Sequence, residues 1–197
     1  MSSSKDLNGF HPSRKRGSAV NSTGFSRYPI AQGTNLAMYT GDLLKMSSGY
    51  VTPITTTTDY AVGVLMGVRY VDKTSKQPIW SKYIASSVSS DDSNTYAFVD
   101  DDPNSTFIVQ ADASLTIGDT ALNFDVTLGA GSTFTGMSGF GIKAASRVAT
   151  TAMVRPIAVY DQPDNGFTGA AGAYPKMEVR ILRNQEYSVV ACVVGPV

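Results

Sequence analysis

The chain has 197 residues, no net formal charge, and a single cysteine and histidine. This length suits one domain with a core that needs no disulfide, and a lone Cys192 excludes an intrachain bridge. Catalytic triads, zinc centres and most general-base schemes use a placed histidine, but His11 lies beside Pro12 in a segment without regular pattern. We therefore expect no enzyme: no catalytic residue, no metal and no cofactor.

Residues 1–29 show neither the alternation of a strand nor the period of a helix, so we expect an extended basic arm before a single β-rich domain over 30–197. Five basic residues and one acid give this segment a net charge of +4, which leaves −4 for the remainder. It could be a disordered terminus, or it could order by burying its rings on a partner. The candidate contact residues are Phe10, Arg14, Lys15, Arg16, Phe25, Arg27 and Tyr28.

Three consecutive basic residues, Arg14–Arg16, are too few to indicate specific nucleic-acid binding. The start of the chain has no apolar segment typical of a secretory signal, and no stretch of about 20 apolar residues could span a bilayer. We expect synthesis in a cytoplasm, with neither nucleic acid nor membrane as a specific partner.

Short strands separated by turns are expected over residues 35–71. The last of them, Tyr60–Val71, is interrupted by Gly63 and Gly67. Glycine inside a strand marks a bulge, a bend or the close approach of another backbone, so we expect this strand to curve.

Extended segments are expected again over residues 77–83, 96–99 and 106–110. The first carries Trp80, the only tryptophan, which is a packing residue or an anchor in a subunit contact. Between the other two, Asp100–Asp102 form the densest negative charge in the chain. They read as a solvated turn, with a calcium site as the alternative, although their spacing is not that of an EF-hand.

The rest of the chain indicates further strands at 113–117, 123–128, 156–160 and 176–184, and an apolar strand at 188–194. Alternation puts Phe124, Val126 and Leu128 on one face of a strand. In the segment KMEVRI it puts Met177, Val179 and Ile181 on one face, and Glu178 and Arg180 on the other, in water or against a partner. A short helix is expected over 144–152. About ten short strands and at most one helix predict an all-β barrel or sandwich.

Phosphate-binding, dinucleotide, paired-cysteine and zinc-protease motifs are absent from the sequence. A two-carboxylate glycosidase has no motif to exclude it, but the acidic residues fall mostly in turns.

Several stretches together resemble the head decoration, or cement, proteins of tailed bacteriophages, especially phages of cyanobacteria and other marine bacteria. The resemblance covers roughly residues 30–185 and is carried by Thr40–Leu43, Tyr60–Val64, Phe107–Asp112, Ile117–Asp119 and Lys176–Ile181.

This resemblance implies a β-rich virion protein on the exterior of an icosahedral capsid. Its partner would be the major capsid protein, whose capsomers it would lock together, and it would be a trimer or dimer. Two alternatives remain open at this point: a fibre-associated virion protein that grips a receptor glycan through rings such as Trp80, and an enzyme on a β-barrel with Asp112 or Glu178 essential.

Overall fold

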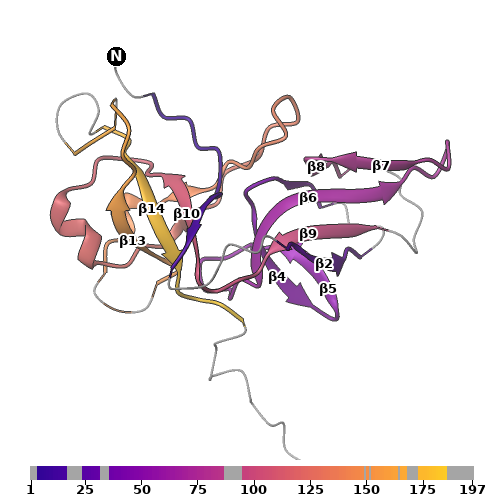
Figure 1. Ribbon diagram of the computed structural model, residues 1–197, viewed down its shortest axis with the longest axis horizontal. Coiled ribbons are helices and arrows are strands. Elements are labelled where there is room, and N and C mark those ends of the chain that lie inside the picture. The colour runs from indigo at the N-terminus through magenta and orange to yellow at the C-terminus, as the bar shows by residue number, and fades with distance from the viewer. Residues whose placement is uncertain are drawn as a thin grey trace, which may run out of the picture.

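The computed structural model of the protein describes residues 4–16, 24–31, 36–86, 95–148, 150, 152–163, 165–167 and 173–185. Regular structure in these residues is mostly β, in several antiparallel sheets, and no closed barrel forms among them (Figure 1). The arrangement fits an all-β sandwich, so the predicted fold class is confirmed. No helix in the described ranges is long and apolar enough to cross a membrane.

One sheet has four strands in the order β1 (His11–Lys15), β10 (Ser105–Gln110), β14 (Lys176–Ile181) and β13 (Val154–Val159). Strand β14 shows the predicted alternation, because Met177, Val179 and Ile181 are buried and Arg180 is exposed. The same alternation places Glu178 on the opposite face with Arg180, but Glu178 is also buried, because the Arg14 guanidinium of β1 and the Thr106 hydroxyl of β10 donate to its carboxylate.

The second sheet has the order β2 (Ser26–Pro29), β9 (Tyr96–Asp100), β6 (Gly63–Val71), β4 (Leu43–Ser47) and β5 (Tyr50–Pro53), and β7 (Pro78–Ser81) also pairs with β6. Two of the three expected effects of glycine, a bulge and the close approach of another backbone, occur in β6. The register with β9 shifts between Leu65 and Gly67, which is a bulge at Met66. A side chain at Gly63 would collide with the Asp100 backbone and with Val99 Cγ1, at 2.6 Å.

The part of the chain that the structure describes also has two short pairs: β3 (Met38–Tyr39) with β8 (Tyr83–Ile84), and β11 (Val126–Thr127) with β12 (Gly141–Ile142). The prediction of a strand over 113–117 is wrong. A 3-10 helix, η2 (Ile117–Ala121), begins there because Asp119 accepts hydrogen bonds from the backbone N–H and hydroxyl of Thr116.

The helix predicted over 144–152 is reduced to one 3-10 turn, η3 (Ala144–Ser146). Val148 instead exchanges two backbone hydrogen bonds with Asn123, which holds the chain extended directly after the turn.

Among the described residues, two hydrophobic clusters form the core, and strands of the second sheet contribute to both. Neighbouring residues on a strand point to opposite faces. Leu43 and Val64 therefore join the cluster beneath the four-stranded sheet, while Leu44 and Leu65 join the other cluster. The chain passes from the second sheet to the first at residues 100–105, where β9 leads into β10 (Figure 1).

The N-terminal residues are extended, as expected, but they are paired within the body of the protein. Strand β1 lies against β10, and β2 lies against β9. Phe10 is 0% exposed, and its ring packs edge-on against Phe107 with centroids 6.3 Å apart. Residues 4–16 and 24–29 are therefore part of the sandwich and not an irregular arm. The apolar strand predicted over 188–194, with Cys192, lies outside the described residues.

Candidate functional site

The outer side of the second sheet carries a row of rings and cations from four strands and the segments next to them. On β9 the alternation places Tyr96 and Phe98 outward while Thr95, Ala97 and Val99 are buried. Cross-strand pairing then brings outward residues of β2, β6 and β7 beside them. We call this surface the aromatic face; it consists of Phe25, Arg27, Gly67, Arg69, Trp80, Lys82, Tyr96 and Phe98.

Its rings are held by stacking and by cations. The ring of Trp80, which is 67% exposed, stacks on Phe98 with a centroid distance of 5.2 Å and an interplanar angle of 20°. The guanidinium carbon of Arg69 lies 5.7 Å from the centroid of Trp80, and that of Arg27 lies 5.5 Å from Tyr96. These are cation–π distances, so the face is ordered without help from a partner.

A groove of about 460 Å³ runs across this face, lined by Phe25, Met66, Gly67, Val68, Trp80, Ser81, Lys82 and Phe98. Gly67 pairs with Phe98 in the sheet and lies one strand away from β7. Because glycine presents no side chain, a gap is left beside the Phe98 ring. An added Cβ at Gly67 would meet only the backbone oxygen of Ser81, at 3.4 Å, so the gap is not imposed by crowding.

The other sequence-predicted contact residues divide between the interior and the surface. Phe10 belongs to the core, so its assignment as a contact residue is corrected. Phe25, at 47% exposed, and Arg27 lie on the aromatic face, and Arg16 is exposed. The Tyr28 hydroxyl donates to Asp101 at 2.8 Å.

Arg14 and Lys15 make ion pairs within the chain. Arg14 binds both carboxylate oxygens of Glu178, at 2.7 and 3.0 Å, and Lys15 lies 2.7 Å from Asp102. These contacts lower the pKa of Glu178, chiefly through Arg14, and of Asp102, chiefly through Lys15. The basic N-terminal residues thus neutralise acids of the body, which explains much of the uneven charge along the chain.

The acidic turn has a structural role at the crossover between the sheets. The Asp100 carboxylate accepts from the Ser105 hydroxyl at 2.9 Å, and Asp101 and Asp102 accept from Tyr28 and Lys15. Over the described ranges, no group of three histidine, cysteine or acidic residues is arranged to hold a metal ion. His11 lies on β1, where burial and the nearby Lys176 lower its pKa.

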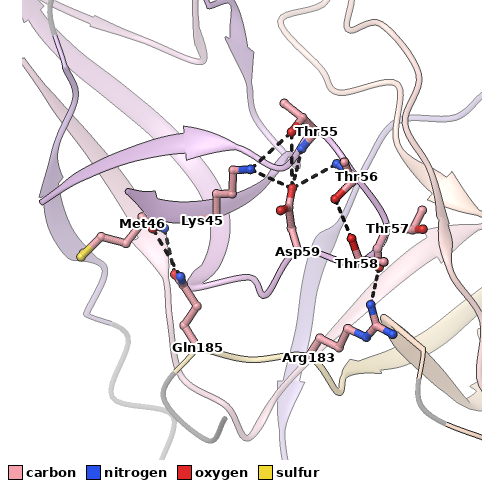
Figure 2. A network of polar contacts seen from close by, with 9 residues as sticks. All are labelled: Lys45, Met46, Thr55, Thr56, Thr57, Thr58, Asp59, Arg183 and Gln185. Carbon is pink, nitrogen blue, oxygen red and sulfur yellow. Dashed lines mark hydrogen bonds and ion pairs between the residues drawn. The ribbon is translucent and has the colours of Figure 1, made fainter. Parts of the chain in front are cut away.

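The first two of the four consecutive threonines, Thr55 and Thr56, hydrogen-bond to one carboxylate in a turn (Figure 2). Asp59 accepts from the backbone N–H groups of Thr55 and Thr56 at 2.9 and 3.0 Å, and from Lys45 Nζ at 2.9 Å. Burial acts to raise the pKa of Asp59, but these hydrogen bonds outweigh it and hold the pKa at about 2. The network fixes the turn between β5 and β6.

The same network attaches the last described residues to the second sheet (Figure 2). Arg183 donates to the Thr57 carbonyl at 2.8 Å, and the Gln185 side chain bonds both the N–H and the carbonyl of Met46. The Gln185 side-chain amide thus makes the two backbone hydrogen bonds to β4 that a neighbouring strand would otherwise make.

A loop at residues 129–139 projects from the body near β8 (Figure 1). Its base is closed by hydrogen bonds from Thr40 N–H to Gly136 and from Ser138 N–H to Thr40, and Gly136 packs against Lys82 of the groove. Phe134 near its tip is 98% exposed. The loop therefore presents an uncovered ring from a well-anchored base.

Several residues of the aromatic face were not singled out from the sequence. The alternation in YAFVD contains the signal for Tyr96 and Phe98, but nothing local shows that Arg69 and Trp80 lie beside them. Comparison with protein-family models, with curated proteins and with solved structures finds no match to this chain.

Proposed function

We propose that the protein is a structural component of a tailed-phage virion that binds the outside of the head and stabilises contacts between capsomers of the major capsid protein. The resemblance of residues 30–185 to decoration proteins motivates the proposal. The observation that carries it is the aromatic face, an exposed group of rings framed by cations and built on paired strands. Aromatic residues and arginine are the types enriched at protein interfaces.

The entropy cost of binding favours attachment through the aromatic face over attachment through an N-terminal arm that becomes ordered only on contact. Each residue of an initially irregular arm costs about 1–2 kcal/mol of backbone entropy to fix. Trp80, Phe98 and Arg69 already lie on paired strands, so their backbone order is established before binding. Burying one large apolar side chain then contributes roughly 1.5–3 kcal/mol.

The loop carrying Phe134 supports a second contact with the same surface. It stands next to the groove through Gly136 and Lys82. Two attachment points on one subunit, repeated in a dimer or trimer, would add avidity in the way that linked binding sites do. The oligomer is part of the proposal.

The test is binding of purified protein to heads that lack it, measured by co-sedimentation, together with its location on intact virions by cryo-electron microscopy. Removing residues 2–27 is unsuitable, because it would delete β1 and the core ring of Phe10. Trp80→Ala combined with Phe134→Ala leaves the core intact, and we expect it to reduce occupancy at least tenfold. Absence of the wild-type protein from the head exterior contradicts the proposal.

A receptor-binding virion protein is the second candidate, and the exposure of Trp80 is the observation that favours it, because sugars stack on such rings. Binding of the isolated protein to a glycan array, lost in Trp80→Ala, would support this function instead.

A further inference from the structure

We propose that the groove at Gly67 binds an acidic protein segment with one apolar side chain, which enters the groove while its carboxylates meet Arg27, Arg69 and Lys82. This deepens the proposed function and rests on it, because the segment would belong to the head surface.

Charge is the first argument. In the described part of the chain, Arg14, Lys15, Lys45 and Arg147 each pair with a carboxylate. Arg27 and Arg69 have no carboxylate partner among the described residues and lie over rings instead. Lys82 lines the groove and is exposed. Three cations thus frame one apolar groove, which is complementary to a segment with negative charges beside an apolar residue.

Shape is the second argument. The lining is mostly apolar, with Phe25, Met66, Val68, Trp80 and Phe98 around the gap left by Gly67. A charged or polar side chain entering it would lose hydration and meet mostly apolar groups, with Ser81 and Lys82 as the polar residues of the lining. An aliphatic or aromatic side chain gains contact with the Trp80 and Phe98 rings. The occupant therefore has an apolar centre and acidic flanks.

Nucleic acid fits less well, although rings and arginines also occur on its binding surfaces. Binding of single strands uses free ring faces on which successive bases stack. Here Phe98 stacks on one side of Trp80, and the guanidinium groups of Arg27 and Arg69 lie over Tyr96 and Trp80. These contacts already occupy part of the ring surfaces, although Trp80 remains 67% exposed, and the groove adds one apolar gap beside them.

Trp80 makes the groove directly observable, because it is the only tryptophan and lines the groove. Its fluorescence is followed while the peptide Glu-Glu-Phe-Glu-Glu is added, with Glu-Glu-Ser-Glu-Glu, Lys-Lys-Phe-Lys-Lys and a short oligothymidylate as comparisons. We expect a blue shift with the first peptide, at least tenfold weaker binding of the other three, and weakening with added salt. An equal or stronger response to the oligothymidylate, or no response to the first peptide, overturns the proposal.

Two variants connect the groove to attachment on the head. Gly67→Leu fills the gap without removing a core contact, and Arg69→Glu reverses one of the framing charges. Each is expected to bind heads at least tenfold more weakly than wild type, while Arg180→Glu, an exposed charge reversal on β14, binds as wild type does. The urea midpoint of each variant reports whether it folds.

The outcomes separate the two proposals. If wild-type protein does not bind heads, the proposed function fails, whatever the peptides do. If wild-type protein binds heads and Gly67→Leu binds equally well, the function stands and the groove assignment fails. Analytical ultracentrifugation tests a third outcome. If wild-type protein self-associates and Gly67→Leu abolishes the self-association, the groove binds a second copy of the chain, and the assignment of the groove to an acidic segment of the head surface fails.

Discussion

The carboxyl group of Asp42 gives the protein a dependence of stability on pH that can be worked out from the structure. Asp42 is 3% exposed, at the turn between β3 and β4. It accepts from the Tyr39 backbone N–H at 2.7 Å, and a hydrogen bond joins it to Ser138. Burial outweighs these hydrogen bonds and raises its pKa from 3.8 to about 6.

A raised pKa means that the folded protein binds the Asp42 proton more tightly than the unfolded chain does. The resulting stability is fully present below pH 3.8 and is lost as the pH rises through about 6. The difference between the two pKa values corresponds to about 3 kcal/mol, since one pKa unit is ~1.4 kcal/mol. Above pH 7, ionised Asp42 therefore makes folding less favourable by about that amount.

Asp42→Asn removes the titration and keeps the shape, because its amide oxygen can still accept from Tyr39. We expect the variant to be more stable than wild type by up to ~3 kcal/mol at pH 7.5, and by less than ~1 kcal/mol at pH 4. Urea unfolding monitored by Trp80 fluorescence across this range measures both. A difference that does not change with pH, or a less stable variant at pH 7.5, refutes the reasoning, because Asp42 would then keep an ordinary pKa.

Three further substitutions and one control test the packing and the charges. Gly63→Ala should lose about 1–3 kcal/mol of unfolding free energy by collision with β9, whereas Gly24→Ala, whose Cβ meets nothing within 4 Å, should change little. Phe10→Ala should cost about 3–5 kcal/mol in urea unfolding, and a loss below ~1 kcal/mol would show that the N-terminal segment is not in the core. Asp59→Asn should cost about 1 kcal/mol at pH 7, after allowance for solvent screening. That cost should shrink as the pH falls through about 2, so the pH dependence of stability from Asp59 is opposite in sign to that from Asp42. Thermal unfolding followed by circular dichroism at pH 7 and at about pH 2 checks it.

Several elements of the fold are predictable from local sequence. The alternation in KMEVRI identifies β14 and its buried face, and Gly63 and Gly67 indicate the curved strand with its bulge. Two local predictions fail for identifiable reasons. At Thr116 hydrogen bonds donated to the Asp119 carboxylate favour a 3-10 turn over a strand, and the Asn123–Val148 pairing ends the expected helix after one turn.

The candidate site was predictable only in part. Trp80 stands out as a possible contact residue because it is the only tryptophan, and it does lie on the exposed aromatic face. Arg14 and Lys15 also stood out as charges, but their partners, Glu178 and Asp102, lie far along the chain. A sequence shows that a charge is present, while the fold decides whether that charge is already paired.

The sequence by itself determined the extended segments over residues 35–71, 96–110 and 176–181, the apolar face of strands such as β9, and where glycine bends the chain, because these properties depend on residues two to four positions apart. Only the tertiary structure decided that β2, β9, β6 and β7 are neighbours, and therefore that Arg27, Phe98, Gly67 and Trp80 share one surface. Strand order depends on pairing between segments that lie far apart along the chain, a condition on the whole chain that no local pattern contains.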